Sequence, residues 1–177
     1  MNKPIYNFFT SDHRRVEQIL LEAIADIDNI NLDLYETFRV GLMTHIKMEE
    51  KVLFLAAQEA NNGEPLPIAA QLRLEHGAIT TLLSVPPNPT LIKVLVYILH
   101  KHDFREEEPG GMYDACEALT ADQTDELLQR LRAVTDVPTR SLNPLPMVFE
   151  TAIRTVQRAG YDYDEIAGMT IDPKVLL

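Results

Sequence analysis

The longest stretch with an unbroken helical pattern is residues 32–60, LDLYETFRVGLMTHIKMEEKVLFLAAQEA. Apolar and polar side chains recur in it at steps of three and four residues, the spacing that places them on one face of an α-helix. The members of this face are Phe38, Leu42, His45, Glu49, Val52 and Ala56. The stretch ends at Asn61-Asn62-Gly63-Glu64-Pro65, because glycine and proline disfavour further helix. We therefore predict a long helix that points a histidine and a glutamate toward a core.

Turn signals on both sides of this helix divide residues 1–110 into four helices of similar length. The first is predicted to start at Thr10-Ser11-Asp12 and to end at 28–31, the third to cover about 67–84, and the fourth about 90–107, before Pro109-Gly110-Gly111. No alternating strand pattern of useful length occurs, so the predicted class is all-α. Short connections make successive helices antiparallel neighbours. The prediction is an up-down-up-down antiparallel four-helix bundle.

The remainder of the chain is predicted to form a C-terminal helical extension. Helical patterns cover 112–119, 122–134 and 147–159, and residues 162–177 stay unassigned. We expect two units, a bundle at 1–115 and an extension at 116–177 that packs on the bundle. The extension would serve as a cover or as a partner surface, including a homodimer contact.

Composition excludes several partners and sites. The chain has 27 acidic and 16 basic residues, a net charge of −11, which repels nucleic acid and anionic lipid surfaces. Cys116 is the only cysteine, so the chain has neither an intramolecular disulfide nor a cysteine-based zinc site. No apolar run is long enough for a signal peptide or a membrane span. These features favour a cytoplasmic protein.

Two segments share the pattern His-x-x-x-Glu-Glu, at 45–50 and at 102–107. Residues four apart share a helix face, so His45 with Glu49, and His102 with Glu106, could each present an imidazole and a carboxylate to one metal ion. An exposed histidine beside a solvated acidic run is the alternative for a single such pair. His13 and His76 also lie on apolar stripes, so four helices each point one histidine inward. Such buried groups, joined by two glutamates, need a shared partner.

The positions of the turns give an independent test of depth. The midpoint of His13 and His45 is residue 29, that of His45 and His76 falls between 60 and 61, and that of His76 and His102 is 89. Each midpoint lies in or at the edge of a predicted turn, so the four histidines should meet in one layer. His100 is about 200° of helix rotation from His102 and is expected on the polar side with Lys93 and Asp103. We also assign Glu50, Glu107 and Glu108 to a solvated face, with Glu107 as an alternative to Glu106.

The composition of this layer favours iron. Four imidazoles and two carboxylates exceed the ligands of one tetrahedral zinc ion, and a mixed nitrogen and oxygen set suits iron. If two octahedral ions shared both glutamates and one bridging oxygen, roughly two coordination positions would stay open for a small ligand.

Together these segments resemble the hemerythrin-like HHE cation-binding domain, over about residues 6–115. The resemblance rests on Asp12-His13-Arg14-Arg15, the two His-x-x-x-Glu-Glu segments and Glu75-His76. It implies two non-haem iron ions, bridged by an oxo or hydroxo group, with the ligands His13, His45, Glu49, His76, His102 and Glu106. It also implies a protein that binds or senses O2, NO or iron.

Two departures from the family keep an alternative function open. Thr80 stands where oxygen-carrying hemerythrins have a further histidine, one turn after His76. Iron–sulfur repair proteins of this type carry an N-terminal cysteine-bearing segment, which is missing here. The alternative is an enzyme, either a di-iron oxidoreductase or an iron–sulfur cluster repair protein. We assign no catalytic residue, because Tyr6, Phe8, Phe9 and Tyr113, the nearest candidates, are more simply explained by packing.

Overall fold

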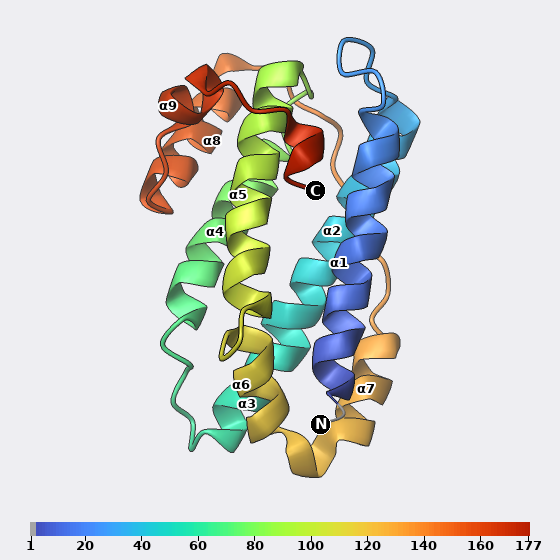
Figure 1. Ribbon diagram of the computed structural model, residues 1–177, viewed down its shortest axis with the longest axis vertical. Coiled ribbons are helices and arrows are strands. Elements are labelled where there is room, and N and C mark those ends of the chain that lie inside the picture. Colours follow the sequence, from blue (N-terminus) through green and yellow to red (C-terminus); the bar gives the residue numbers. More distant parts are fainter. Residues whose placement is uncertain (1–2) are drawn as a thin grey trace.

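The computed structural model describes residues 3–177, which contain helices and no strand, so the predicted all-α class is confirmed for this part of the chain. The long helices lie along the long axis of the molecule (Figure 1). They are α1 (Pro4–Ala23), α2 (Leu32–Met48), α4 (Ala69–Leu82) and α5 (Pro89–Glu107). No helix in the described residues is long and apolar enough to cross a membrane.

Helix α1 begins earlier than predicted. Thr10 to Asp12 lie inside it, and Pro4 occupies its first turn, where proline loses no hydrogen bond. The free N–H groups of Ile5 and Tyr6 donate to one carboxylate oxygen of Glu117, at 2.8 and 2.9 Å. Because this cap comes from a residue more than 100 positions away, the local sequence could not reveal the start of α1.

The predicted end of the first helix at 28–31 was wrong, because α1 ends at Ala23. Local caps explain why the starts of α2 and α5 were predicted well. Asn31 accepts hydrogen bonds from two N–H groups at the start of α2, and Asn88 accepts one at the start of α5. Helical structure then continues from α2 through the π-helical segment η1 (Glu49–Leu53) into α3 (Phe54–Ala60). The predicted bounds of 32–60 are therefore confirmed. The π-helical segment, which the sequence pattern did not predict, begins at Glu49, and such segments are frequent at functional sites.

A buried polar layer separates two hydrophobic clusters. On α1, for example, Phe9 belongs to one cluster and Val16 to the other, with His13 between them. The same alternation occurs around the single buried histidine of α2 and of α4, whereas on α5 the apolar residues before His102 belong to one cluster and the other cluster resumes at Met112. The layer thus crosses the molecule at one level, as the turn midpoints predicted.

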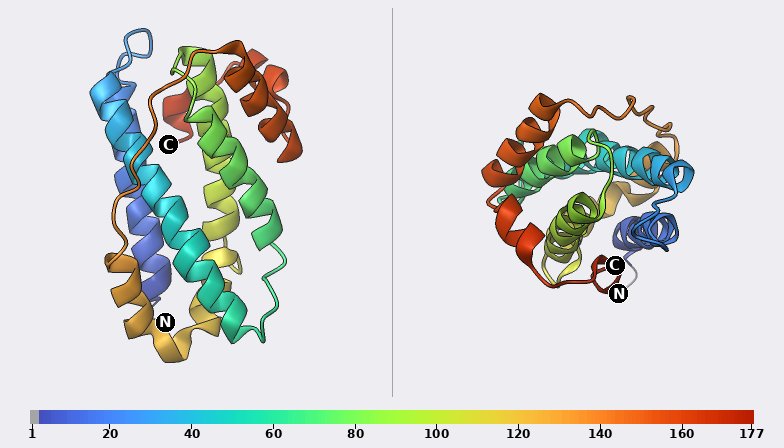
Figure 2. Two further views of the ribbon diagram at one scale, coloured as in Figure 1. Left: turned by 180° about the vertical axis from the view of Figure 1, so that it is seen from behind. Right: turned by 90° about the horizontal axis from the view of Figure 1, so that it is seen from above.

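The rest of the chain covers both ends of the long helices. Helices α6 (Met112–Leu119) and α7 (Thr124–Arg132), with the short 3-10 helix Ala121–Gln123 between them, lie at the end that holds the N-terminal part (Figure 1). Residues 133–145 then run back along α2 to the opposite end (Figure 2), where Asn143 N–H donates to the carbonyl of Ser84. Helices α8 (Pro146–Arg158) and α9 (Tyr163–Gly168) and the 3-10 helix Pro173–Val175 complete the chain there.

The predicted helices of this extension agree with the structure within a few residues. Helix α8 packs against α4, and α9 packs against α5. The boundary that we predicted between residues 115 and 116 falls inside α6, which packs against α1, α3 and α5. The division into two domains stays a prediction.

Candidate metal centre

The structure brings all six predicted ligands into the buried layer. Their side chains form two groups that could each hold a metal ion, with ligand atoms within 4.8 Å of one another. The His13 group contains His13, His45, Glu49 and Glu106. The His76 group contains Glu49, His76, His102 and Glu106. Both glutamates therefore belong to both groups.

Each glutamate turns one oxygen toward each pair of histidines. Glu49 Oε1 lies 3.4 Å from His45 Nε2, whereas its Oε2 lies 3.1 Å from His76 Nε2. Glu106 is arranged in the same way, with Oε2 3.4 Å from His13 Nε2 and Oε1 3.3 Å from His102 Nε2. This is the arrangement in which a carboxylate can bridge two ions.

Unsatisfied atoms indicate that the layer fits a cation. Among residues 3–177, Glu49 Oε2 and Glu106 Oε1 are buried side-chain oxygens without a hydrogen-bond partner, since the nearby histidine nitrogens are not oriented for one. Leaving such an atom unpaired costs about 1–3 kcal/mol, and more when it is charged. In the His76 group, His76 Nε2 lies 3.1 Å from His102 Nε2. If one of these nitrogens carries a proton, it can donate to the other, which then has no proton of its own to donate. A metal ion would satisfy all four atoms.

A ring of carboxylates holds the outer nitrogens of the histidines. All four Nε2 atoms face the layer, and each Nδ1 contacts a carboxylate from a different helical segment. The pairs are Asp12 with His45 at 2.9 Å, Glu50 with His76 at 2.8 Å, Glu75 with His102 at 3.0 Å, and Glu107 with His13 at 2.6 Å. A carboxylate of each helical segment thus contacts the histidine of the next segment along the chain, and Glu107 of α5 contacts His13 of α1. Such carboxylates orient metal-binding histidines.

This ring corrects part of the sequence interpretation. Glu50 and Glu107 were assigned to a solvated face, but their side chains are only 20% and 24% exposed, because each contacts a histidine. Glu106 is fully buried in the layer, so it takes the inward position for which Glu107 was the alternative. The roles of Asp12 and Glu75 were missed, although both directly precede a predicted ligand. His100 is exposed, as expected.

The electrostatics of the layer favour exchange of protons for a cation. Burial by itself would lower the pKa of His45, but the charge of Glu49 and the contact with Asp12 outweigh it and raise this pKa to about 8. The pKa values of His13 and His102 are raised well above the usual range in the same way, despite burial. Burial opposes ionisation of Glu49 too, yet His45 and His76 hold its pKa well below the usual range. Metal ions would displace these protons.

Tyr113 was expected to serve packing only, but the structure shows a second role for its hydroxyl. The ring does stack on Phe9, with 5.0 Å between centroids. Its Oη, however, lies within hydrogen-bond distance of all four members of the His13 group, at 2.6 Å from Glu49 Oε1, 2.9 Å from Glu106 Oε2, 3.0 Å from His13 Nε2 and 3.3 Å from His45 Nε2. Burial, then the charges of Glu106 and Glu49, raise the pKa of Tyr113 well above its usual range.

A close approach between α5 and α6 brings Tyr113 to this place. Gly111 ends the connection, and a Cβ atom on it would lie 2.6 Å from the carbonyl oxygen of Arg105. Because only glycine fits there, α6 can start immediately beside the last turn of α5. The periodic pattern of apolar residues ends at the Pro109-Gly110-Gly111 break. It therefore could not predict that α6 lies close to the last turn of α5.

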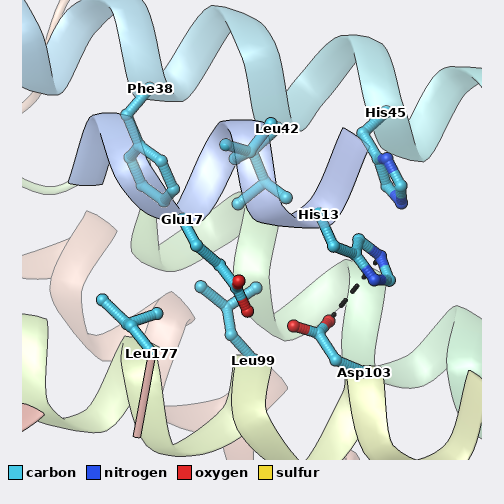
Figure 3. A pocket seen from close by; sticks show the side chains of 9 residues that line it. His13, Glu17, Phe38, Leu42, His45, Leu99, Asp103 and Leu177 are labelled. Carbon is cyan, nitrogen blue, oxygen red and sulfur yellow. Dashed lines mark ion pairs between the residues drawn. The ribbon is translucent and has the colours of Figure 1, made fainter. Parts of the chain in front are cut away.

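A small cavity adjoins the His13 group, with about 20 Å³ of space for a water-sized molecule. Its walls are mostly apolar, and Figure 3 shows His13, His45 and Asp103 together at one end. Asp103 Oδ1 lies 3.8 Å from His13 Nε2, and its side chain is only 13% exposed, so the expected place on the polar side is wrong. Glu17 also lines the cavity, and burial, followed by the charge of Asp103, raises its pKa to about 7.

No family model, curated protein or solved structure matches this chain. The geometry of the site is therefore the basis for inferring a function.

Proposed function

We propose that this chain is a hemerythrin-like protein that holds two non-haem iron ions and uses them to bind or sense a small ligand, O2 or NO, or iron itself. The observation that carries the proposal is the placement of Glu49 and Glu106, each with one oxygen toward each histidine pair. Buried nitrogen and oxygen donors without thiolates suit iron.

The course of the chain supports the proposed architecture. In Figure 1 the chain ascends α1, descends α2, ascends α4 and descends α5, as an up-down-up-down bundle requires. Each of these four helices contributes one histidine to the layer. Metal sites of helical bundles are built from facing helices in this manner.

The chain's own residues define which ligand can enter. An iron pair, when bound, supplies open coordination positions to a small molecule. Phe38, Leu42 and Leu99 give the adjoining cavity apolar walls, and a space of about 20 Å³ admits a molecule of about the size of water. The carboxylate ring keeps all four histidine rings oriented while a small molecule enters or leaves. The cavity therefore favours a diatomic ligand over a larger substrate.

Anaerobic loading with Fe(II) tests the proposal. Metal analysis should give about two irons per chain, and the optical spectrum should change on addition of O2 or NO. His45→Ala removes a proposed ligand and should lose most of the metal, whereas His100→Ala, at an exposed position of α5, should retain it. Equal iron contents of the two variants would refute the proposed ligand set. Two bound irons that respond to neither gas would refute the ligand-binding function.

A di-iron oxidoreductase is the second candidate, because Asp103 and Tyr113 place groups that can hold or pass a proton beside the His13 group. The two functions differ in stoichiometry. A binding protein supplied with excess O2 and a reductant should consume no more than about one O2 per iron pair. Continued consumption over many equivalents would favour the oxidoreductase.

A further inference from the structure

We propose that Tyr113 is a fifth protein ligand, through its phenolate oxygen, of the metal ion in the His13 group. The inference rests on the proposed function and deepens it, because it makes the two metal positions chemically different. Neither the ligand pattern of the helices nor the spacing of the histidines contains this residue.

The distances around Tyr113 Oη fit a shared coordination shell. Metal bonds to imidazole nitrogen and carboxylate oxygen are about 2.0–2.2 Å long. Two donors at a right angle on one ion are then about 3.0 Å apart, and two opposite donors about 4.2 Å. Oη lies 2.6–3.3 Å from all four donors of the His13 group. These distances are compatible with one ion that Oη would hold together with the four donors of the His13 group.

Hydrogen bonding accounts for only part of this contact, because Oη can accept from the nitrogens of His13 and His45 but faces two carboxylates as well. A phenol carries one proton, which can be donated to one acceptor at a time. Two of the four atoms around Oη are the carboxylate oxygens Glu49 Oε1 and Glu106 Oε2, and the single phenol proton can serve only one of them at a time. One cation at the centre of the group would satisfy these atoms and Oη together.

The position of the phenol is fixed by packing. Tyr113 is fully buried, its ring stacks on Phe9, and the edge of Tyr6 contacts it with 6.3 Å between centroids. Ordering a free side chain at a metal would cost conformational entropy, and here this cost is already met in the fold. In the described residues, no hydroxyl makes a comparable contact with His76 or His102. The fifth donor is thus confined to the His13 group.

Coordination would replace the Oη–H bond of Tyr113 by an Oη–metal bond. The proton leaves to solvent, as metal binding to protonated ligands requires, and no atom changes its oxidation state. The His13 position then has two imidazoles, two shared carboxylates and one phenolate, whereas the His76 position lacks the phenolate.

The test compares wild type with Tyr113→Phe and with the matched control Tyr6→Phe. Tyr6 is on the same side of the molecule, but its hydroxyl donates to the backbone carbonyl of Glu107 and contacts no proposed ligand. Each protein is loaded anaerobically with Fe(II), oxidised with ferricyanide, and examined by metal analysis, visible absorption and resonance Raman spectroscopy. A phenolate bound to Fe(III) gives a visible charge-transfer band that enhances the ring vibrations of tyrosine.

We expect this band in wild type and Tyr6→Phe and its complete loss in Tyr113→Phe. In Tyr113→Phe, the affinity of the protein for one of the two irons, measured by competition with a chelator, should also fall at least about tenfold. Two irons in wild type without the tyrosine vibrations would overturn the inference and leave the proposed function intact, with the phenol as a hydrogen-bond donor. Persistence of the band in Tyr113→Phe would overturn it too. Wild type that binds fewer than two irons would refute the proposed function together with this inference.

Discussion

Replacing Glu17 by glutamine should stabilise the metal-free protein at neutral and alkaline pH. The side chain is only 13% exposed and lines the cavity beside His13. Burial is the main cause that raises its pKa from 4.5 to about 7, and the negative charges of Asp103 and Glu107 add to it. Arg14, 3.1 Å away, and His13 oppose the rise. Above pH 7 the Glu17 carboxylate is therefore ionised in the native protein, and this charge lowers the free energy of unfolding.

The sign and size of the effect follow from this pKa. Because the folded pKa exceeds the unfolded value, the stabilisation from protonated Glu17 is fully present below about pH 4.5 and is lost as the pH rises through about 7. At about 1.36 kcal/mol for each pKa unit, the loss is at most about 3.4 kcal/mol. Solvent screening and the loss of the ion pair with Arg14 reduce the benefit of the substitution, so we expect about 1–2 kcal/mol.

Urea unfolding of chelator-treated protein between pH 4.5 and 8.5 measures this effect. The difference in unfolding free energy between Glu17→Gln and wild type should be close to zero at pH 4.5 and should reach its maximum above pH 7. Glu22→Gln, at an exposed position of α1, is the control and should change stability by less than about 0.5 kcal/mol at every pH. A constant difference across the range, or a destabilised variant at pH 8, would refute the reasoning.

Three further predictions test other parts of the account. Asp12→Asn weakens the orientation of His45 and should lower iron affinity about 10–100-fold, measured by chelator competition, whereas Asp33→Asn at the exposed start of α2 should not. Because the pKa of His45 is raised to about 8, protonated His45 stabilises the metal-free fold fully below about pH 6.5, and this stabilisation is lost as the pH rises through 8. The difference in thermal midpoint between iron-loaded and metal-free protein should therefore widen from pH 6 to pH 9, and a difference that narrows would contradict the prediction. Gly111→Ala should lower the free energy of unfolding by about 1–3 kcal/mol, measured by chemical unfolding, because the added Cβ meets backbone oxygens. Gly77→Ala, with open space around it, should be neutral or stabilising, and equal effects of the two substitutions would count against the close approach of α5 and α6.

Sequence reasoning located the six inward residues because their signal is local to each helix. His45 and Glu49 are four residues apart on one face, and the turn midpoints place His13 and His76 at the same depth. These features depend only on helix periodicity and on short connections. The structure adds which glutamate oxygen faces which histidine, and this information depends on side-chain conformation.

The missed residues act between helices. Asp12 precedes His13 but contacts His45, and Glu75 precedes His76 but contacts His102, so neighbours in sequence give the wrong pairing. Tyr113 reaches the layer from a helix beyond a proline and glycine break, where face periodicity is interrupted. The early start of α1 depends on Glu117 for the same reason. Contacts that arise from packing of distant segments leave no periodic pattern in the sequence.

The separation of two metal ions is the most direct measurement of the central claim, that Glu49 and Glu106 hold an iron pair between four histidines. X-ray absorption of iron-loaded wild type, with metal analysis of the same sample, reports both the number of ions and the distance between them. We predict about two irons per chain and an iron–iron scattering path at about 3–4 Å, the range of carboxylate-bridged two-metal sites. A single iron per chain, or two irons without such a path, would contradict it.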